Sequence, residues 1–253
     1  ITTGENYAYL KIADGCSNYC TYCAIPGIRG PLKSRKMESI ISEAKDLAKK
    51  GYKEIILTAQ DTTKYGVDNY GKPMLSNLLE EICKIEKIKW IRFLYAYPET
   101  ITDELISTIK KHPQICQYFD IPIQHISDMV LKRMNRHSDG KSIRNLITKI
   151  RKELPNAILR TTVMVGFPEE TNEEFEKLYN FVKEAKFDKL GAFAYSKEEG
   201  TPAEKMKNQV HWKTKKSRYN KIMKLQQEIS RNNLKEKVGK TYEVMIEGIT
   251  KNG

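Results

Sequence analysis

Short apolar runs alternate along the chain with longer segments in which apolar residues recur at helical spacing. Such runs are typical of buried strands, and such segments are typical of helices with one apolar face. Six strands are predicted in this way, over residues 7–12, 54–58, 90–95, 118–121, 158–165 and 190–194. The predicted helices between them cover residues 37–50, 75–86, 102–111, 127–134, 140–154 and 171–185.

Six strand–helix repeats indicate a parallel α/β architecture. The count is two short of the eight strands of a closed barrel, so we expect an open partial (β/α)6 TIM-type barrel over residues 1–203. Active-site residues of such a barrel lie on the loops at the C-terminal ends of its strands. Periodicity alone is equally compatible with a doubly wound sheet.

The pattern changes after Pro202, where a long helix is predicted over residues 212–237. Between Lys205 and Lys240 there are 12 Lys and Arg residues against 2 Glu, so this segment carries most of the net charge of +12. A basic segment on a nearly neutral domain favours contact with nucleic acid, although a solvated helix face has the same composition. We divide the chain into the barrel, a basic linker helix at 204–238 and, at 239–253, the start of a small β-domain with a strand over 242–246.

The cysteines indicate a metal or cluster site in a reducing, cytoplasmic setting. No apolar run is long enough to span a membrane, so no membrane partner is expected. Three of the five cysteines lie within eight residues in the spacing C-x3-C-x2-C, directly after the first strand: Cys16, Cys20 and Cys23. Structural zinc needs four ligands, and a fourth from His125, Cys83 or Cys116 remains open. Three thiolates alone leave one iron of a [4Fe–4S] cluster free to bind another molecule.

This spacing, with Tyr22 before the last cysteine, resembles the radical S-adenosylmethionine (SAM) superfamily. The resemblance implies that SAM chelates the open iron of a [4Fe–4S] cluster through its amino and carboxylate groups. It also implies that an electron, delivered by a reductant protein, cleaves SAM to a 5′-deoxyadenosyl radical. No residue is then needed as a catalytic acid or base, because the cofactors carry the reaction.

Further stretches, at residues 24–30, 59–66, 122–127, 132–134 and 160–168, are similar to methylthiotransferases. Ala59-Gln60-Asp61-Thr62-Thr63 resembles the RimO-like branch, which modifies the β-carbon of an aspartate in a small-subunit ribosomal protein. The branch that modifies tRNA adenosine typically has a Gly-Gln-Asn type sequence there, and it is the alternative. A non-catalytic iron–sulfur or zinc-binding scaffold is a second alternative. Full-length relatives add an N-terminal domain with a second [4Fe–4S] cluster and a C-terminal TRAM β-barrel, so the ribosome and RNA are the implied partners.

The resemblance also implies a set of cofactor-binding residues. Tyr22 belongs to the cluster motif, and Gln60, after the second strand, is placed to contact the SAM amino group. Arg160, at the start of the fifth strand, is the candidate for the SAM carboxylate. Gln124 is expected near the ribose, and Gly166 is expected to shape the loop beside the adenine.

One residue departs from the family pattern. Glu169 stands where relatives usually have Gly, in Gly166-Phe167-Pro168-Glu169-Glu170-Thr171. We expect that function is unaffected, and that the loop conformation depends less on glycine here than in relatives.

Overall fold

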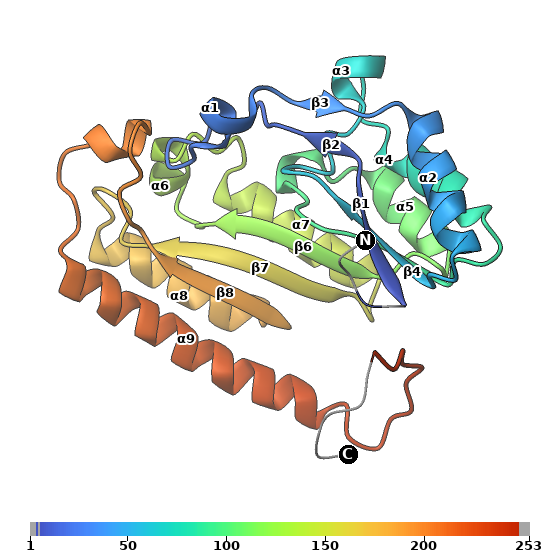
Figure 1. The fold of residues 1–253 in the computed structure, drawn as a ribbon. Coiled ribbons are helices and arrows are strands. Elements are labelled where there is room, and N and C mark those ends of the chain that lie inside the picture. Colours follow the sequence, from blue (N-terminus) through green and yellow to red (C-terminus); the bar gives the residue numbers. More distant parts are fainter. Residues whose placement is uncertain (1–3, 5, 248–253) are drawn as a thin grey trace.

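The computed structural model describes residue 4 and residues 6–247 of the chain (Figure 1). Its main strands are parallel and form two three-stranded sheets. The first sheet contains β1 (Tyr7–Lys11), β4 (Glu54–Thr58) and β5 (Trp90–Phe93). The second contains β6 (Tyr118–Gln124), β7 (Ile158–Val165) and β8 (Lys189–Ala194).

Backbone hydrogen bonds between β5 and the segment that leads into β6 join the two sheets edge to edge. The Ile91 N–H donates to the Gln114 carbonyl at 2.8 Å, and the Cys116 N–H donates to the Ile91 carbonyl at 2.8 Å. The result is one curved sheet in the order β1-β4-β5-β6-β7-β8. Strand order follows chain order without the reversal of a doubly wound sheet, and no pairing between β1 and β8 closes the ring within residues 6–247. The predicted open partial barrel is therefore confirmed.

Helices cover the outer face of this sheet, and the hydrophobic core lies between the two layers. The side chains of Leu159, Thr161, Val163 and Val165 on β7 are buried, each two residues from the next, as the alternation of side chains along a strand requires. The covering helices are α2 (Met37–Lys49), α4 (Leu75–Cys83), α5 (Asp103–Lys111), α7 (Gly140–Glu153) and α8 (Asn172–Ala185). Thr102 caps α5, and Thr171 with Glu174 forms a capping box on α8.

Short elements follow the strands and were not predicted, apart from α6 (Asp128–Arg133). They are β2 (Ala13–Asp14), β3 (Lys33–Ser34), α1 (Ile25–Arg29), α3 (Val67–Tyr70) and the 3-10 turns η1 (Pro98–Thr100) and η2 (Pro202–Lys205). Each is too short to show a periodic pattern in the sequence.

The basic helix α9 (Trp212–Lys235) packs along the barrel beside α8 and β8 (Figure 1). Ile222, Leu225 and Ile229 are buried against the core, so the expected linker helix is part of the packed domain. The buried Arg218 donates to Glu170 Oε1 at 3.1 Å and thereby ties α9 to the loop after β7. In the part of the chain that is described, no helix is both long enough and apolar enough to cross a membrane.

The prediction of a strand at residues 242–246 is wrong, because residues 240–247 form no regular secondary structure. A strand needs a neighbouring strand to receive its hydrogen bonds, and the described part of the chain offers none here. This segment instead contacts the barrel through an ion pair between Lys89 and Glu243 and through a hydrogen bond from Asn6 Nδ2 to the Ile246 carbonyl. The rest of the expected β-domain, residues 248–253, lies outside the described residues, so the domain division stays a prediction.

The loop with the unusual Glu169 keeps a conformation that favours glycine. Glu169 has φ 64°, in the left-handed region, and its N–H donates to the Asn208 carbonyl at 3.0 Å. The expectation that this loop depends less on glycine is therefore wrong, because the side chain is accommodated in a strained backbone.

We predict that Glu169→Gly raises the free energy of unfolding by about 0.5–1 kcal/mol, since relief of strain exceeds the added entropy of the unfolded chain. Urea denaturation measures the change. Glu199→Gly is the matched control, because Glu199 is exposed and is not among the residues with positive φ. A Glu169→Gly variant no more stable than the parent would contradict the strain assignment.

Candidate functional site

The cysteine loop begins at a glycine that no other residue can replace without a shift. Gly15 has φ 68°, and a Cβ atom there would lie 2.1 Å from the Pro31 carbonyl oxygen. The next residue, Cys16, donates its N–H to the Gly30 carbonyl at 3.1 Å. The hairpin of β2 and β3 therefore fixes the point at which the first thiol enters the site.

The three thiols lie close enough together for the charge of one to affect the ionisation of another. Cys16 and Cys20 are buried and Cys23 is half-buried, and all three are free thiols. Burial raises the pKa of Cys16, and the nearby Asp61, Cys20 and Cys23 raise it further. Among the described residues, no three His, Cys, Asp or Glu side chains are grouped as ligands of one metal ion. A cubane cluster spreads its thiolates over several iron atoms, so this donor set fits a [4Fe–4S] cluster better than a zinc ion.

The loop after β4 anchors the cysteine loop through a buried carboxylate. Asp61 Oδ2 accepts a hydrogen bond from Asn18 Nδ2 at 2.9 Å. Its Oδ1 accepts from the backbone N–H of Thr63 at 3.1 Å and from the Thr63 hydroxyl at 2.7 Å. Asp61 and Thr63 belong to the Ala-Gln-Asp-Thr-Thr segment that resembles the RimO-like branch. In the structure these two residues support the cysteine loop rather than face solvent.

The loop after β5 contacts a cysteine directly. The Tyr97 hydroxyl lies 3.4 Å from Cys20 Sγ, and the Tyr97 N–H donates to the Thr63 hydroxyl at 3.1 Å. The Arg136 guanidinium lies over the Tyr97 ring at 4.1 Å and donates through Nη2 to the Pro122 carbonyl. Arg136 is 6% exposed, yet its Nε and Nη1 have no hydrogen-bond partner in the structure. It therefore offers buried donors beside the cysteine loop. Sequence reasoning missed Tyr97 and Arg136, because neither belongs to a short motif.

The remaining strand ends hold the loop at Thr21 and Tyr22. The Thr21 N–H donates to the Met134 carbonyl at 3.1 Å, and the Thr21 carbonyl accepts from the Ala203 N–H at 2.9 Å. The Tyr22 ring packs edge-to-face on Phe167, which follows β7, with ring centroids 6.4 Å apart. The cysteine loop thus rests on segments that follow β4, β5, β6, β7 and β8.

Three predicted cofactor-binding residues lie at the same strand ends. Gln60 follows β4, and its buried Oε1 accepts no hydrogen bond from the described residues. Gln124 ends β6 with φ 66°, a left-handed conformation that is rare for this residue type. Gly166 follows β7 with φ 69°, and a Cβ atom there would lie 2.3 Å from Cγ of Lys215 on α9. Their contacts with a cofactor, and that of Tyr22, remain predictions.

Arg160 lies at the opposite end of β7 from the cysteine loop. It is the third residue of β7, six positions before Gly166, and about 20 Å of strand separates the two backbones. Its side chain is half exposed, and its Nε lies 3.6 Å from Asp120 Oδ1. Its proposed contact with the SAM carboxylate has no support from this placement. Arg136 is better placed for that contact.

His125 is a buried structural residue. Its Nδ1 accepts a hydrogen bond from the Ser127 N–H at 3.0 Å, and burial lowers its pKa to about 3. It is therefore neutral at physiological pH. Cys83 ends α4 and Cys116 lies at the junction of β5 and β6, and burial raises the pKa of each thiol to about 11. None of the three joins the cysteine loop as a fourth ligand of a single ion within the described residues.

Comparison with solved structures supports the fold. A radical SAM methyltransferase, TsrM from Kitasatospora setae, superposes with a TM-score of 0.64 at 15% identity, covering 78% of this chain and 38% of that one. Coproporphyrinogen III oxidase (HemN) from Escherichia coli gives a TM-score of 0.65 at 15% identity, covering 89% of this chain and 53% of that one. At this level of identity the likeness concerns the fold alone.

Residues 10–182 match the sequence model of the Radical SAM superfamily. The chain belongs to that superfamily, and membership implies a [4Fe–4S] cluster and SAM as cofactors. Within it, the chain is 64% identical to the ribosomal protein uS12 methylthiotransferase RimO of Alkaliphilus oremlandii, over 100% of this chain and 58% of that protein. The protein of the same name from Clostridioides difficile is 56% identical, over 98% of this chain and 56% of that protein. The predicted RimO-like similarity is thus confirmed, and the chain spans little more than half the length of these relatives.

We predict that Tyr97→Phe lowers the reduction potential of the reconstituted cluster while leaving its iron content unchanged. A thiolate bound to iron can only accept, so the phenol donates to Cys20, and hydrogen bonds to cluster sulfurs raise the potential. An anaerobic redox titration followed by electron paramagnetic resonance measures the shift. Tyr95→Phe removes a hydroxyl from the same loop and is the control. An unchanged potential in Tyr97→Phe would contradict the assignment.

Proposed function

We propose that this chain is the SAM-cleaving core of a methylthiotransferase that acts on ribosomal protein uS12. The observation that carries the proposal is the 54–64% identity, along nearly the whole chain, to proteins with that name. The arrangement of the three cysteines and the burial of Asp61 beneath their loop are consistent with it. The product is an aspartate that carries a methylthio group on its β-carbon.

Residues at the strand ends would bind and orient the cofactors. Cys16, Cys20 and Cys23 hold the cluster, which when bound supplies the electron that breaks a carbon–sulfur bond of SAM. The unpartnered Oε1 of Gln60 is an acceptor for the ammonium group of SAM, and the free donors of Arg136 suit its carboxylate. Because Arg136 is buried, this charge-assisted contact is not screened by solvent.

Tyr22, Gln124 and Gly166 shape the remainder of the cofactor site. The Tyr22 ring packs on Phe167 and closes one side, while Gly166 leaves space that Lys215 partly fills. Gln124 presents an amide from the end of β6 toward the expected position of the ribose. These groups exclude water from a reaction at an unactivated C–H bond, which no acid or base in the site could deprotonate.

The chain needs further parts and partners to complete the reaction. A second [4Fe–4S] cluster, in an N-terminal domain of the full-length protein, would supply sulfur, and a second SAM would supply the methyl group. A reductant protein would deliver electrons. The exposed lysines of α9 favour an additional contact with RNA of the cytoplasmic ribosome.

Reductive cleavage of SAM tests the role of this chain. We expect the anaerobically reconstituted chain, reduced with dithionite, to form 5′-deoxyadenosine from SAM. A variant with Cys16, Cys20 and Cys23 all changed to Ala should lose this activity completely. Chromatography of the quenched reaction measures the product. Tight zinc binding without 5′-deoxyadenosine would favour a non-catalytic scaffold.

The full-length protein tests the substrate. With both clusters rebuilt, it should add a methylthio group to an aspartate of uS12, which tandem mass spectrometry of the peptide locates. Unmodified tRNA, offered in a parallel reaction, should remain unchanged. Modification of tRNA adenosine with no change in uS12 would replace the proposed substrate with the alternative one.

A further inference from the structure

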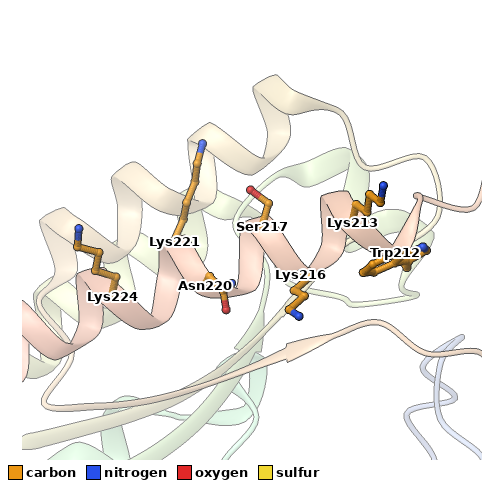
Figure 2. A pocket seen from close by; sticks show the side chains of 7 residues that line it. All are labelled: Trp212, Lys213, Lys216, Ser217, Asn220, Lys221 and Lys224. Atoms are coloured by element: carbon orange, nitrogen blue, oxygen red, sulfur yellow. The ribbon is translucent and has the colours of Figure 1, made fainter.

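One face of α9 presents a shallow groove of about 570 Å³ that the cofactor site does not use (Figure 2). Four lysines line it: Lys213, Lys216, Lys221 and Lys224. The hydroxyl of Ser217 and the amide of Asn220 lie between them, and Trp212 stands at the beginning of the helix. The Trp212 side chain is 59% exposed.

The four lysines, called the stripe below, recur three, five and three residues apart and spread over the outward half of the helix, with Lys216 on the other side from Lys221 and Lys224 (Figure 2). From Lys213 to Lys224 the helix rises about 16 Å, with roughly one cation for each turn of 5.4 Å. The opposite face of α9 carries Ile222, Leu225 and Ile229, which are buried in the core. Because that apolar face packs against the barrel, the stripe lysines face solvent.

Two cations of α9 differ from the stripe lysines in their contacts. Arg218 is bound to Glu170, and Lys215 donates to the Tyr195 carbonyl at 2.8 Å, so these two serve the fold. The four stripe lysines make no ion pair with any described residue. The sole acidic residue within α9, Glu228, lies one turn beyond the stripe. Lys221 lies over the Phe175 ring at 5.7 Å and Lys213 over the Trp212 ring at 5.8 Å, but neither contact neutralises the charge of its lysine.

We infer that this stripe binds the sugar–phosphate backbone of RNA, with Trp212 stacking on a base at one end. The inference rests on the proposed function, because a ribosomal substrate brings RNA with it. A cation at every helical turn matches the regular succession of phosphates along a strand. The amide of Asn220 and the hydroxyl of Ser217 can hydrogen-bond to phosphate or ribose oxygens between the lysines.

Other anionic partners fit this surface less well. A helix that binds a membrane surface inserts an apolar face, whereas the apolar face of α9 is already buried in the barrel. An acidic protein surface would not use an exposed indole at the end of the stripe as a stacking platform, whereas a nucleic acid base does. RNA is therefore the partner that the exposed groups favour.

The position of the stripe connects it to the catalytic end of the barrel. The segment that leads into α9 contacts the cysteine loop, since Ala203 donates its N–H to the Thr21 carbonyl. Figure 1 shows the first turn of α9 at the same end of the molecule as α1 and α6. RNA bound along the stripe would therefore begin near the active-site opening and hold a ribosomal protein beside it.

Binding of a labelled single-stranded RNA of about 20 nucleotides tests the inference, with fluorescence anisotropy read over a series of salt concentrations. Changing the four stripe lysines to Gln in the whole 253-residue chain should weaken binding at least tenfold. It should also reduce the slope of log K against log salt by about 3, since each phosphate contact on a single strand contributes about 0.7. Trp212→Ala should weaken binding about tenfold with little change in slope.

A matched variant controls for net charge. Lys45, Lys50, Lys141 and Lys152 are exposed on or beside α2 and α7, and changing them to Gln removes the same charge elsewhere. This variant should keep most of the affinity. An equal loss in both variants, or none in the stripe variant, would overturn the inference. Equally tight binding to phosphatidylglycerol vesicles or polyglutamate, lost in the stripe variant, would overturn it in favour of those partners.

The assay separates this inference from the proposed catalytic role. The stripe variant should form 5′-deoxyadenosine at the rate of the parent chain, because the four lysines are exposed and line the groove on α9 rather than the cysteine loop. Lost RNA binding with intact SAM cleavage supports the stripe as an RNA surface. Intact SAM cleavage with unchanged RNA binding rejects the stripe and leaves the catalytic proposal standing.

Discussion

The structure depends on one constraint, which is that a short loop must hold three thiols across the ends of five strands. Asn18 is bound to Asp61, Cys20 to Tyr97, and Thr21 to the backbones of Met134 and Ala203. Because these partners follow different strands, the thiols keep their positions only while the barrel keeps its curvature. The hydrophobic core between sheet and helices therefore supports the cluster geometry as well as the stability of the fold.

The helix α9, on the outside of the barrel, also holds a loop at the end of a strand. Its buried Arg218 meets Glu170 directly after β7, and burial raises the pKa of that carboxyl to about 7 although Arg218 opposes the shift. A buried pair of this kind specifies position more than it adds stability. Lys215 lies against Gly166 beside it. The inner face of α9 thus shapes the loop next to the cofactor site, and its outer face is left to meet a partner.

The long elements and the clustering of Cys16, Cys20 and Cys23 could be predicted from the sequence, because periodicity and spacing are local signals; their role as cluster ligands stays a prediction. The strands at Glu54–Thr58 and Ile158–Val165 and the helix at Asn172–Ala185 lie where the sequence predicted them. Tyr97 and Arg136 were missed, since they approach Cys20 through tertiary folding alone. Arg160 was assigned from the resemblance to relatives, but it lies near the start of β7, whereas Gly166 follows the end of the same strand. The predicted strand at 242–246 is wrong because a strand needs a neighbouring strand, and the residue pattern of one segment does not show whether a neighbour is present.

The most direct test of the account is whether the three-cysteine loop builds a cluster with one open iron. Mössbauer spectroscopy of the chain reconstituted with iron-57 measures this, before and after SAM is added. We expect the spectrum of a [4Fe–4S] cluster in which one of the four iron sites changes its signal when SAM binds. A mononuclear metal, or a cluster with no site that responds to SAM, would contradict the central claim.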